Sequence, residues 1–77
     1  MRQFRYVVVH RQDAWFIHFH AEDYGPYKTQ VEAMLFAVEA AQHLGERGDN
    51  AEVCLMGDNG QIRSEWAYGR DAYPPNL

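Results

Sequence analysis

The sequence predicts an α+β domain in which one helix packs on one face of a four-stranded, mainly antiparallel sheet, in the order ββαββ. Three observations support this fold: a long amphipathic segment with helix start and stop signals, strand-like runs on both sides of it, and a short polar connection inside each pair of runs. Two hairpins joined by a crossover helix give such a sheet. The 77 residues are expected to form a single domain, residues 1–77. The predicted elements are strands at about 4–10, 15–20, 51–56 and 61–68, a helix at about 30–44 and an extended tail at 69–77.

The first hairpin joins two runs that are rich in strand-forming residues, F-R-Y-V-V-V-H and W-F-I-H-F-H. We expect His10 to pair with Trp15, because a slip by one residue would mix the apolar and polar faces. The face toward the helix then carries Phe4, Tyr6, Val8, Trp15, Ile17 and Phe19. The outer face is half apolar and carries Arg5, Val7, Val9, Phe16, His18 and His20. Residues 21–28 contain Gly25 and Pro26 and are expected to form a loop.

The predicted helix begins with a capping box, in which the side chains of Thr29 and Glu32 bond to backbone amides of the first turn. Gly45 is expected to end it in a left-handed conformation. At about 100° per residue, the stripe expected to face the sheet consists of Val31, Met34, Leu35, Val38 and Ala41. An adjoining stripe of mostly small residues consists of Ala33, Ala37, Ala40 and Leu44. Phe36 falls among polar residues, so either it covers a loop or it meets another subunit together with the alanine stripe.

The second hairpin is predicted to turn at Gly57-Asp58-Asn59-Gly60, because Asn and Gly tolerate the positive φ of a tight turn. This turn lacks the later acidic ligands of a calcium-binding loop. The tail contains Pro74-Pro75, which favours an extended end. Two interpretations of the tail stay open. It is either a strap, with Tyr68 and Tyr73 packed on the sheet and Asp71 capping a turn or paired with an arginine, or an arm that docks on a partner.

Composition and charge restrict the possible functions. The formal net charge is −4 and the basic residues are scattered, which argues against an electrostatic grip on nucleic acid. The single cysteine, Cys54, cannot form an internal disulfide, and this favours a cytoplasmic location. The N-terminus has no apolar run of signal-peptide length, and we expect no segment to span a membrane.

Several motifs along the chain together resemble a known family. They are Val8-Val9, Trp15 after a short polar turn, Thr29, Glu32 and Ala33 at the helix start, Gly60-x-Ile62, and the closing run Y-G-R-D-A-Y-P-P at residues 68–75. The closing run resembles the Y-G-x-D-x-x-P-P end of domain of unknown function 2188, a family of small bacterial proteins. The resemblance covers nearly the whole chain and implies a single small cytosolic domain. It brings no known activity, cofactor or catalytic residue.

Few residues are candidates for chemistry. His18 and His20 are the metal-ligand candidates, because alternate residues of a strand point the same way and neutral imidazole is a common ligand. Arg5 is expected opposite His20 and would oppose a bound cation, so the simpler interpretation is a pair of surface histidines. Cys54 lies in mid-strand and is expected to be a small buried side chain. We therefore expect no enzymatic activity, no catalytic residue and no cofactor.

The apolar surface left over by this fold favours a non-enzymatic protein-interaction module that self-associates as a homodimer, or that binds another protein. The interface candidates are Val7, Val9, Phe16, Ala33, Phe36, Ala40 and Tyr73. One alternative is a single-stranded nucleic-acid binder that stacks bases on Phe16, His18 and His20 beside Arg5, although the acidic balance disfavours it. Another is an antitoxin-like regulatory partner, because the small sheet with a T-x-x-E-A helix locally resembles the HicB-like antitoxin fold.

Overall fold

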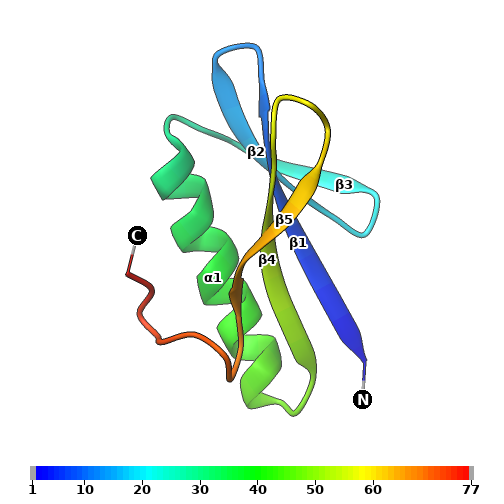
Figure 1. The fold of residues 1–77 in the computed structure, drawn as a ribbon, viewed down its shortest axis with the longest axis vertical. Helices are drawn as coiled ribbons and strands as arrows, with labels where there is room; N and C mark the ends of the chain where they lie inside the picture. The colour runs from blue at the N-terminus through cyan, green and yellow to red at the C-terminus, as the bar shows by residue number, and fades with distance from the viewer. Residues whose placement is uncertain (1, 77) are drawn as a thin grey trace.

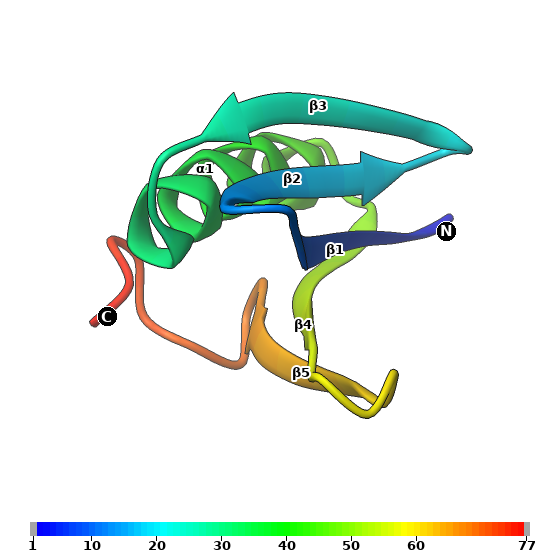
Figure 2. The ribbon, with the colours of Figure 1, turned by 90° about the horizontal axis from the view of Figure 1, so that it is seen from above.

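The computed structural model describes residues 2–76 and has one helix on one face of a five-stranded sheet (Figure 1). The elements are β1 (Gln3–Arg11), β2 (Ala14–Phe19), β3 (Glu22–Tyr27), α1 (Gln30–Glu46), β4 (Asn50–Met56) and β5 (Ile62–Ala67). The strands lie in the order β3-β2-β1-β4-β5, and every neighbouring pair is antiparallel except β1 and β4. The sheet curves, with β3 and β5 at its edges (Figure 2). The α+β class and the single helix are confirmed, whereas the predicted number of four strands is wrong.

The additional strand is β3, which occupies most of the segment that was expected to be a loop. Gly25 and Pro26 indicated a break, but β3 is an edge strand, where a proline without an N–H group is tolerated. The pairing between β2 and β3 shifts register between Trp15 and Ile17. Gly25 has a φ of +135°, and a Cβ placed there would lie 2.9 Å from the carbonyl oxygen of Trp15. The irregular part of β3 therefore contains a glycine in a backbone conformation that other residues rarely adopt. The strand accommodates this irregularity because it lies at the edge of the sheet.

The first hairpin has the predicted register, with His10 opposite Trp15. Its strands are joined through Gln12 and Asp13, which both have positive φ. The strand prediction fails at its end, because β2 stops at Phe19 and His20 has a φ of 52° in the turn to β3. The ring of His20 consequently stacks on Phe4, with ring centroids 5.5 Å apart. Since Phe4 belongs to the face toward the helix, His20 leaves the outer face on which it was predicted.

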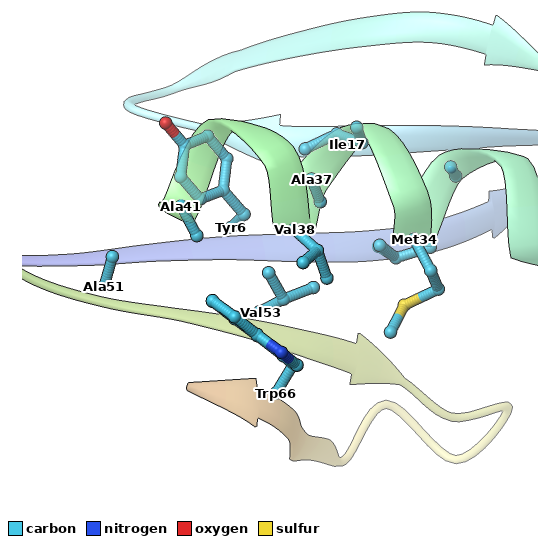
Figure 3. Packing of buried hydrophobic residues seen from close by; sticks show 11 residues of the cluster. Tyr6, Ile17, Met34, Ala37, Val38, Ala41, Ala51, Val53 and Trp66 are labelled. Carbon is cyan, nitrogen blue, oxygen red and sulfur yellow. The ribbon is translucent and has the colours of Figure 1, made fainter. Parts of the chain in front are cut away.

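The core lies between α1 and the inner face of the sheet, but the helix is rotated relative to the prediction. The residues that α1 buries are Ala33, Met34, Ala37, Val38, Ala41 and Gly45. Val31 and Leu35, which were expected to face the sheet, are 51% and 46% exposed. Alanine side chains allow the helix to approach the sheet closely, and the large side chains come from the strands. Trp66 of β5, only 2% exposed, lies beside Val53 and beneath the helix (Figure 3).

The ends of α1 are fixed by local hydrogen bonds. At the start, the amide of Glu32 donates to Thr29 Oγ1 over 3.1 Å, which is one half of the predicted capping box. The other half differs, because the Glu32 carboxylate accepts from the amide of Lys28 and not from that of Thr29. The predicted stop at Gly45 is wrong, because the helix continues to Glu46 with Gly45 buried inside it. Gly48 instead takes the positive φ, +98°, and its amide donates to the carbonyl of Gly45.

The segment after β5 folds back on its own chain. Gly69 has a φ of +84° and turns the backbone after the strand. Asp71 Oδ2 accepts hydrogen bonds from the amide of Ala67 over 2.9 Å and from Arg70 Nε over 2.7 Å. The indole Nε1 of Trp66 donates to the carbonyl of Ala72 over 2.8 Å. The tail therefore folds back on β5, and Asp71 has the role that the first interpretation gives it. The predicted packing of Tyr68 and Tyr73 on the sheet is not seen, because Tyr68 lies against Gly45 of α1 and Tyr73 is 49% exposed.

Candidate protein-binding groove

An apolar groove of about 300 Å³ lies between α1 and the half of the sheet that ends in β3. Its lining residues, most of them aromatic, are Tyr6, Ile17, Phe19, Tyr24, Tyr27, Phe36, Ala37 and Ala40. A hollow of about 250 Å³ at the β4–β5 turn is lined in part by Gly57, Asn59 and Gln61 and is more polar. Ligand sites are mostly apolar and concave with few polar groups, so the aromatic groove is the best candidate for a binding site.

The inner part of the groove follows from the alternation of side chains along β1 and β2. Tyr6 of β1 and Phe19 of β2 share the inner face, and their rings stack with centroids 4.0 Å apart and an interplanar angle of 10°. Opposite them, α1 contributes Ala37 and Ala40. Because an alanine side chain ends at Cβ, the helix does not fill the space in front of the stacked rings. The same small residues that let the helix approach the sheet therefore leave the groove open toward β3.

The outer wall of the groove joins the edge strand to the helix. Tyr27 of β3 stacks against Phe36 of α1, with ring centroids 5.1 Å apart. Phe36 is nevertheless 54% exposed, and Tyr24 of β3 is 45% exposed. Burial of apolar surface stabilises a protein by about 25 cal/mol per Å², and the exposed parts of these rings do not contribute this free energy. A partner that covered these rings would recover that free energy.

The pKa values of two groove tyrosines, Tyr6 and Tyr24, are raised, so their hydroxyls stay protonated. Tyr24 donates its hydroxyl hydrogen to Glu22 Oε2 over 3.0 Å, and this hydrogen bond is the main reason that the pKa of Tyr24 is raised. Burial raises the pKa of Tyr6, with a smaller contribution from Tyr24. Neutral phenols can donate hydrogen bonds but are poor bases at neutral pH. Among the lining residues, the titratable groups are therefore better suited to holding a ligand than to transferring a proton.

The surroundings of the groove carry negative charge. Glu22 lies beside Tyr24, while Glu32 and Glu39 stand four residues before and three residues after Phe36, which places them next to it on the helix surface. Glu22 and Glu39 are exposed, and Glu32 is half-buried. Among residues 2–76, no ion pair involves Glu22, Glu32 or Glu39.

Five of the six arginines, in contrast, form ion pairs elsewhere on the molecule. The pairs are Arg5–Glu52, Arg11–Asp23, Arg47–Asp49, Arg63–Glu65 and Arg70–Asp71. The formal net charge of the chain is −4. The two charges within each of these pairs cancel, so the pairs do not contribute to this net charge. The remaining negative charge includes the glutamates around Phe36, so the field at the groove is acidic.

The outer face of the sheet contains a small apolar cluster that the domain itself covers. Val7, Val9 and Cys54 are 7%, 3% and 2% exposed, and Phe16 packs against them. Burial raises the pKa of the Cys54 thiol, so this side chain stays neutral, as expected of a small buried hydrophobe. Of the interface candidates on this face, Val7 and Val9 are buried, and Phe16 is half-buried.

Ion pairs occupy the polar part of the outer face. Asp23 accepts hydrogen bonds from Arg11 Nη1 over 2.6 Å and lies 2.7 Å from His18 Nδ1. The hydrogen bond from His18 is the largest cause of the lowered pKa of Asp23. The hydrogen bond from Arg11 lowers this pKa further. Arg5 pairs with Glu52 over 2.8 Å. With His20 on the other side of the sheet, the residues predicted to stack nucleic-acid bases do not form one platform.

The predicted metal ligands are also separated. His18 contacts Asp23 on the outer face, whereas His20 stacks on Phe4 and Phe19. Within the described part of the chain, no three His, Cys, Asp or Glu side chains come close enough together to hold a metal ion.

The remaining interface candidates lie in different environments. Ala33 is fully buried between the helix and the sheet, while Ala40 lines the groove. Phe36 lines the groove and is exposed, and Tyr73 in the tail is 49% exposed. Their role in an interface stays a prediction. Tyr24 of the groove was not among the candidates, because residues 21–28 were taken for a loop; the two tyrosines of Y-G-P-Y were the available signal for a strand.

A search for membrane-spanning helices and three comparisons with known proteins concern the chain as a whole. No helix within residues 2–76 is long and apolar enough to cross a membrane. The model of a family described as "Uncharacterized protein conserved in bacteria (DUF2188)" matches residues 5–68, a range that includes every residue of the groove. No curated protein and no solved structure matches the chain.

Proposed function

The chain belongs to the bacterial DUF2188 family, and we propose that this member is a non-enzymatic protein-interaction module that holds a segment of another protein in its aromatic groove. The observation that carries the proposal is the position of Phe36. Its ring lines a concave apolar site of about 300 Å³ and is stacked on Tyr27, yet it is 54% exposed. Exposed aromatic rings at a preformed groove are typical of surfaces that bind proteins.

The chemistry of the groove supports binding rather than catalysis. Its lining consists of aromatic rings, an isoleucine and alanines, with phenol hydroxyls as the polar groups. The raised pKa values of Tyr6 and Tyr24 make these phenols still weaker as bases or nucleophiles at neutral pH. The hydroxyl oxygen of Tyr24, whose hydrogen is donated to Glu22, would instead orient a bound segment by accepting a hydrogen bond from it.

A selection from a random peptide library tests this function. The complete chain is immobilised, binding peptides are enriched, and their dissociation constants are measured for the wild type, Phe36→Ala and Leu35→Ala. Leu35 is a matched control, because it is the neighbouring residue, is 46% exposed, and points about 100° away around the helix. We expect peptides whose affinity falls at least about tenfold in Phe36→Ala, equivalent to about 1.4 kcal/mol, and is unchanged in Leu35→Ala.

Circular dichroism of both variants ensures that a loss of binding does not reflect unfolding. If the selection returns no peptide, or only peptides that bind Phe36→Ala as well as the wild type, the groove is not a protein-binding site and the proposal fails.

Self-association as a homodimer is a second candidate, supported by a different surface. Val31 and Leu35 are 51% and 46% exposed and lie on the flank of α1 that faces away from Ala40 and the groove. A symmetric dimer would use the same patch on both copies, so two such flanks could cover each other. A dimer formed through this flank would leave the groove accessible. Self-association is tested separately from peptide binding, by the molecular mass in solution.

A further inference from the structure

We propose that the segment held by the groove is basic, and that it places a lysine or arginine side chain over the rings of Phe36 and Tyr24 with its charged head near Glu22. This inference rests on the proposed function, and it specifies the chemistry of the partner. It derives from the combination of exposed rings, a carboxylate at the rim and an unbalanced negative charge on both sides of Phe36.

The rings provide the first part of the argument. The face of an aromatic ring attracts a cation, with a contribution of about 0.5–1 kcal/mol at exposed sites and about 2 kcal/mol where the cation is desolvated. Tyr6 and Phe19 stack on each other, and so do Tyr27 and Phe36, which lines the groove with ring surface from both the sheet and the helix. The apolar stem of a lysine or arginine would lie on such a surface while its head reaches the rim.

The carboxylates provide the second part. Glu22 is fixed at the rim by the hydrogen bond from Tyr24, which leaves its other oxygen, Oε1, for a cationic head. On α1, Phe36 is flanked by Glu39, which is exposed, and by Glu32, which is half-buried. The positive charge in the sequence close to them is Lys28, whose backbone amide donates to Glu32 Oε1. A basic partner would therefore meet carboxylates beside Tyr24 and beside Phe36.

Charge also argues against a second copy of this chain as the occupant. In a symmetric contact centred on Phe36, each copy would bring Glu32 and Glu39 to the same surface. Juxtaposed like charges cost free energy and suppress the wrong pairing. The groove therefore suits a partner of opposite charge.

Short peptides of defined composition test the inference by fluorescence anisotropy with the complete chain. The first peptide alternates leucine and arginine, the second replaces every arginine by citrulline, a neutral isostere, and the third replaces it by glutamate. We expect the arginine peptide to bind at least about tenfold more tightly than the citrulline peptide, and the glutamate peptide not to bind. Raising the salt concentration should weaken the arginine peptide and leave the citrulline peptide unchanged.

Variants locate the interaction on the protein. Glu22→Gln and Glu39→Gln should each weaken the arginine peptide several-fold without changing the affinity for the citrulline peptide. Phe36→Ala should weaken both peptides, and Asp58→Asn, an exposed acidic residue at the β4–β5 turn, should change neither. Arginine and lysine should also be enriched among the Phe36-dependent peptides of the library selection.

The possible failures are distinguishable. If the citrulline peptide binds as tightly as the arginine peptide and both depend on Phe36, the groove binds protein but its occupant is not basic. If the arginine peptide binds equally well to Phe36→Ala and is weakened as much by Asp58→Asn as by Glu22→Gln, its binding is unspecific attraction to an acidic protein and the inference is wrong. If no peptide binds, the inference is also wrong, while the library selection still decides on the proposed function.

Discussion

Gly45 of α1 lies directly against the ring of Tyr68, so closely that a Cβ on Gly45 would be 2.1 Å from Tyr68 Cγ. This contact joins the last turn of the helix to the residue that follows β5. It explains why a glycine stands inside the helix, where it normally costs about 0.5–1 kcal/mol relative to alanine. It also gives Tyr68, the first residue of the Y-G-R-D-A-Y-P-P run, a structural role.

Gly45→Ala should therefore destabilise the domain, although an alanine in a helix is usually favourable. The added methyl group collides with Cγ and both Cδ atoms of the Tyr68 ring, and we expect a loss of about 1–3 kcal/mol in the free energy of unfolding. Urea denaturation measures it. The double variant Gly45→Ala/Tyr68→Ala provides the control, because the penalty of the alanine should disappear once the ring is removed. An additive double variant would contradict the contact.

Trp66→Ala should destabilise the domain more than Trp15→Ala. Trp66 is 2% exposed, packs in the main core and donates a hydrogen bond to Ala72, so its truncation should cost about 3–5 kcal/mol. Trp15 is only half-buried and stacks on His10. Thermal denaturation of both variants gives the order, and Trp66→Phe, which keeps most of the volume but loses the hydrogen bond, should fall between Trp66→Ala and the wild type. Equal losses for the two alanine variants would contradict this assignment of the core.

Asp71 should make the stability of the strap depend on pH. Hydrogen bonds from Arg70 and from the amide of Ala67 lower the pKa of Asp71 in the folded chain. A carboxylate whose folded pKa lies below the unfolded value of about 3.9 contributes stability above that value, and this contribution is lost as the pH falls through the folded pKa. Asp71→Asn should thus be less stable than the wild type at neutral pH.

The difference in urea midpoint between Asp71→Asn and the wild type should shrink as the pH is lowered below about 4. Asp13→Asn is the control, because Asp13 lies in the exposed turn between β1 and β2. A difference that stays constant from neutral to acidic pH would mean that the side chain contributes by its shape and not by its charge.

Light scattering tests self-association. At high micromolar concentration the wild type is expected to have the mass of two chains, and Leu35→Glu should reduce it to the mass of one, because the charge would be buried in a symmetric contact. Phe36→Glu is the matched control on the neighbouring position, and it should leave the mass unchanged while abolishing peptide binding in the groove. A wild type that remains a single chain at all concentrations would refute the dimer, and a dimer broken only by Phe36→Glu would place it at the groove.

Part of the candidate site was accessible from the sequence. Phe36 stood out because an aromatic residue fell among the polar positions of the helix, and the structure places it at the groove. Tyr6 and Phe19 were assigned to the inner face from the alternation of the first hairpin. Tyr24 could not be found in this way, since the glycine and proline that follow it are tolerated only because β3 lies at the edge of the sheet. The edge position is a property of the whole sheet and leaves no local signal.

The sequence by itself determined features that depend on neighbouring residues: the N-cap at Thr29, the His10–Trp15 register and the position of the hairpin turn before Gln61, in which Gly60 but not Asn59 has positive φ. Tertiary structure decided which stripe of α1 is buried, where the helix ends and whether residues 22–27 form a strand. Periodicity gave two apolar stripes on the helix, and no local rule chooses between them. The choice depends on the packing of large side chains that are distant in sequence, such as Trp66 and Tyr68, against the alanines and Gly45. The space that these side chains fill exists only once the sheet has formed.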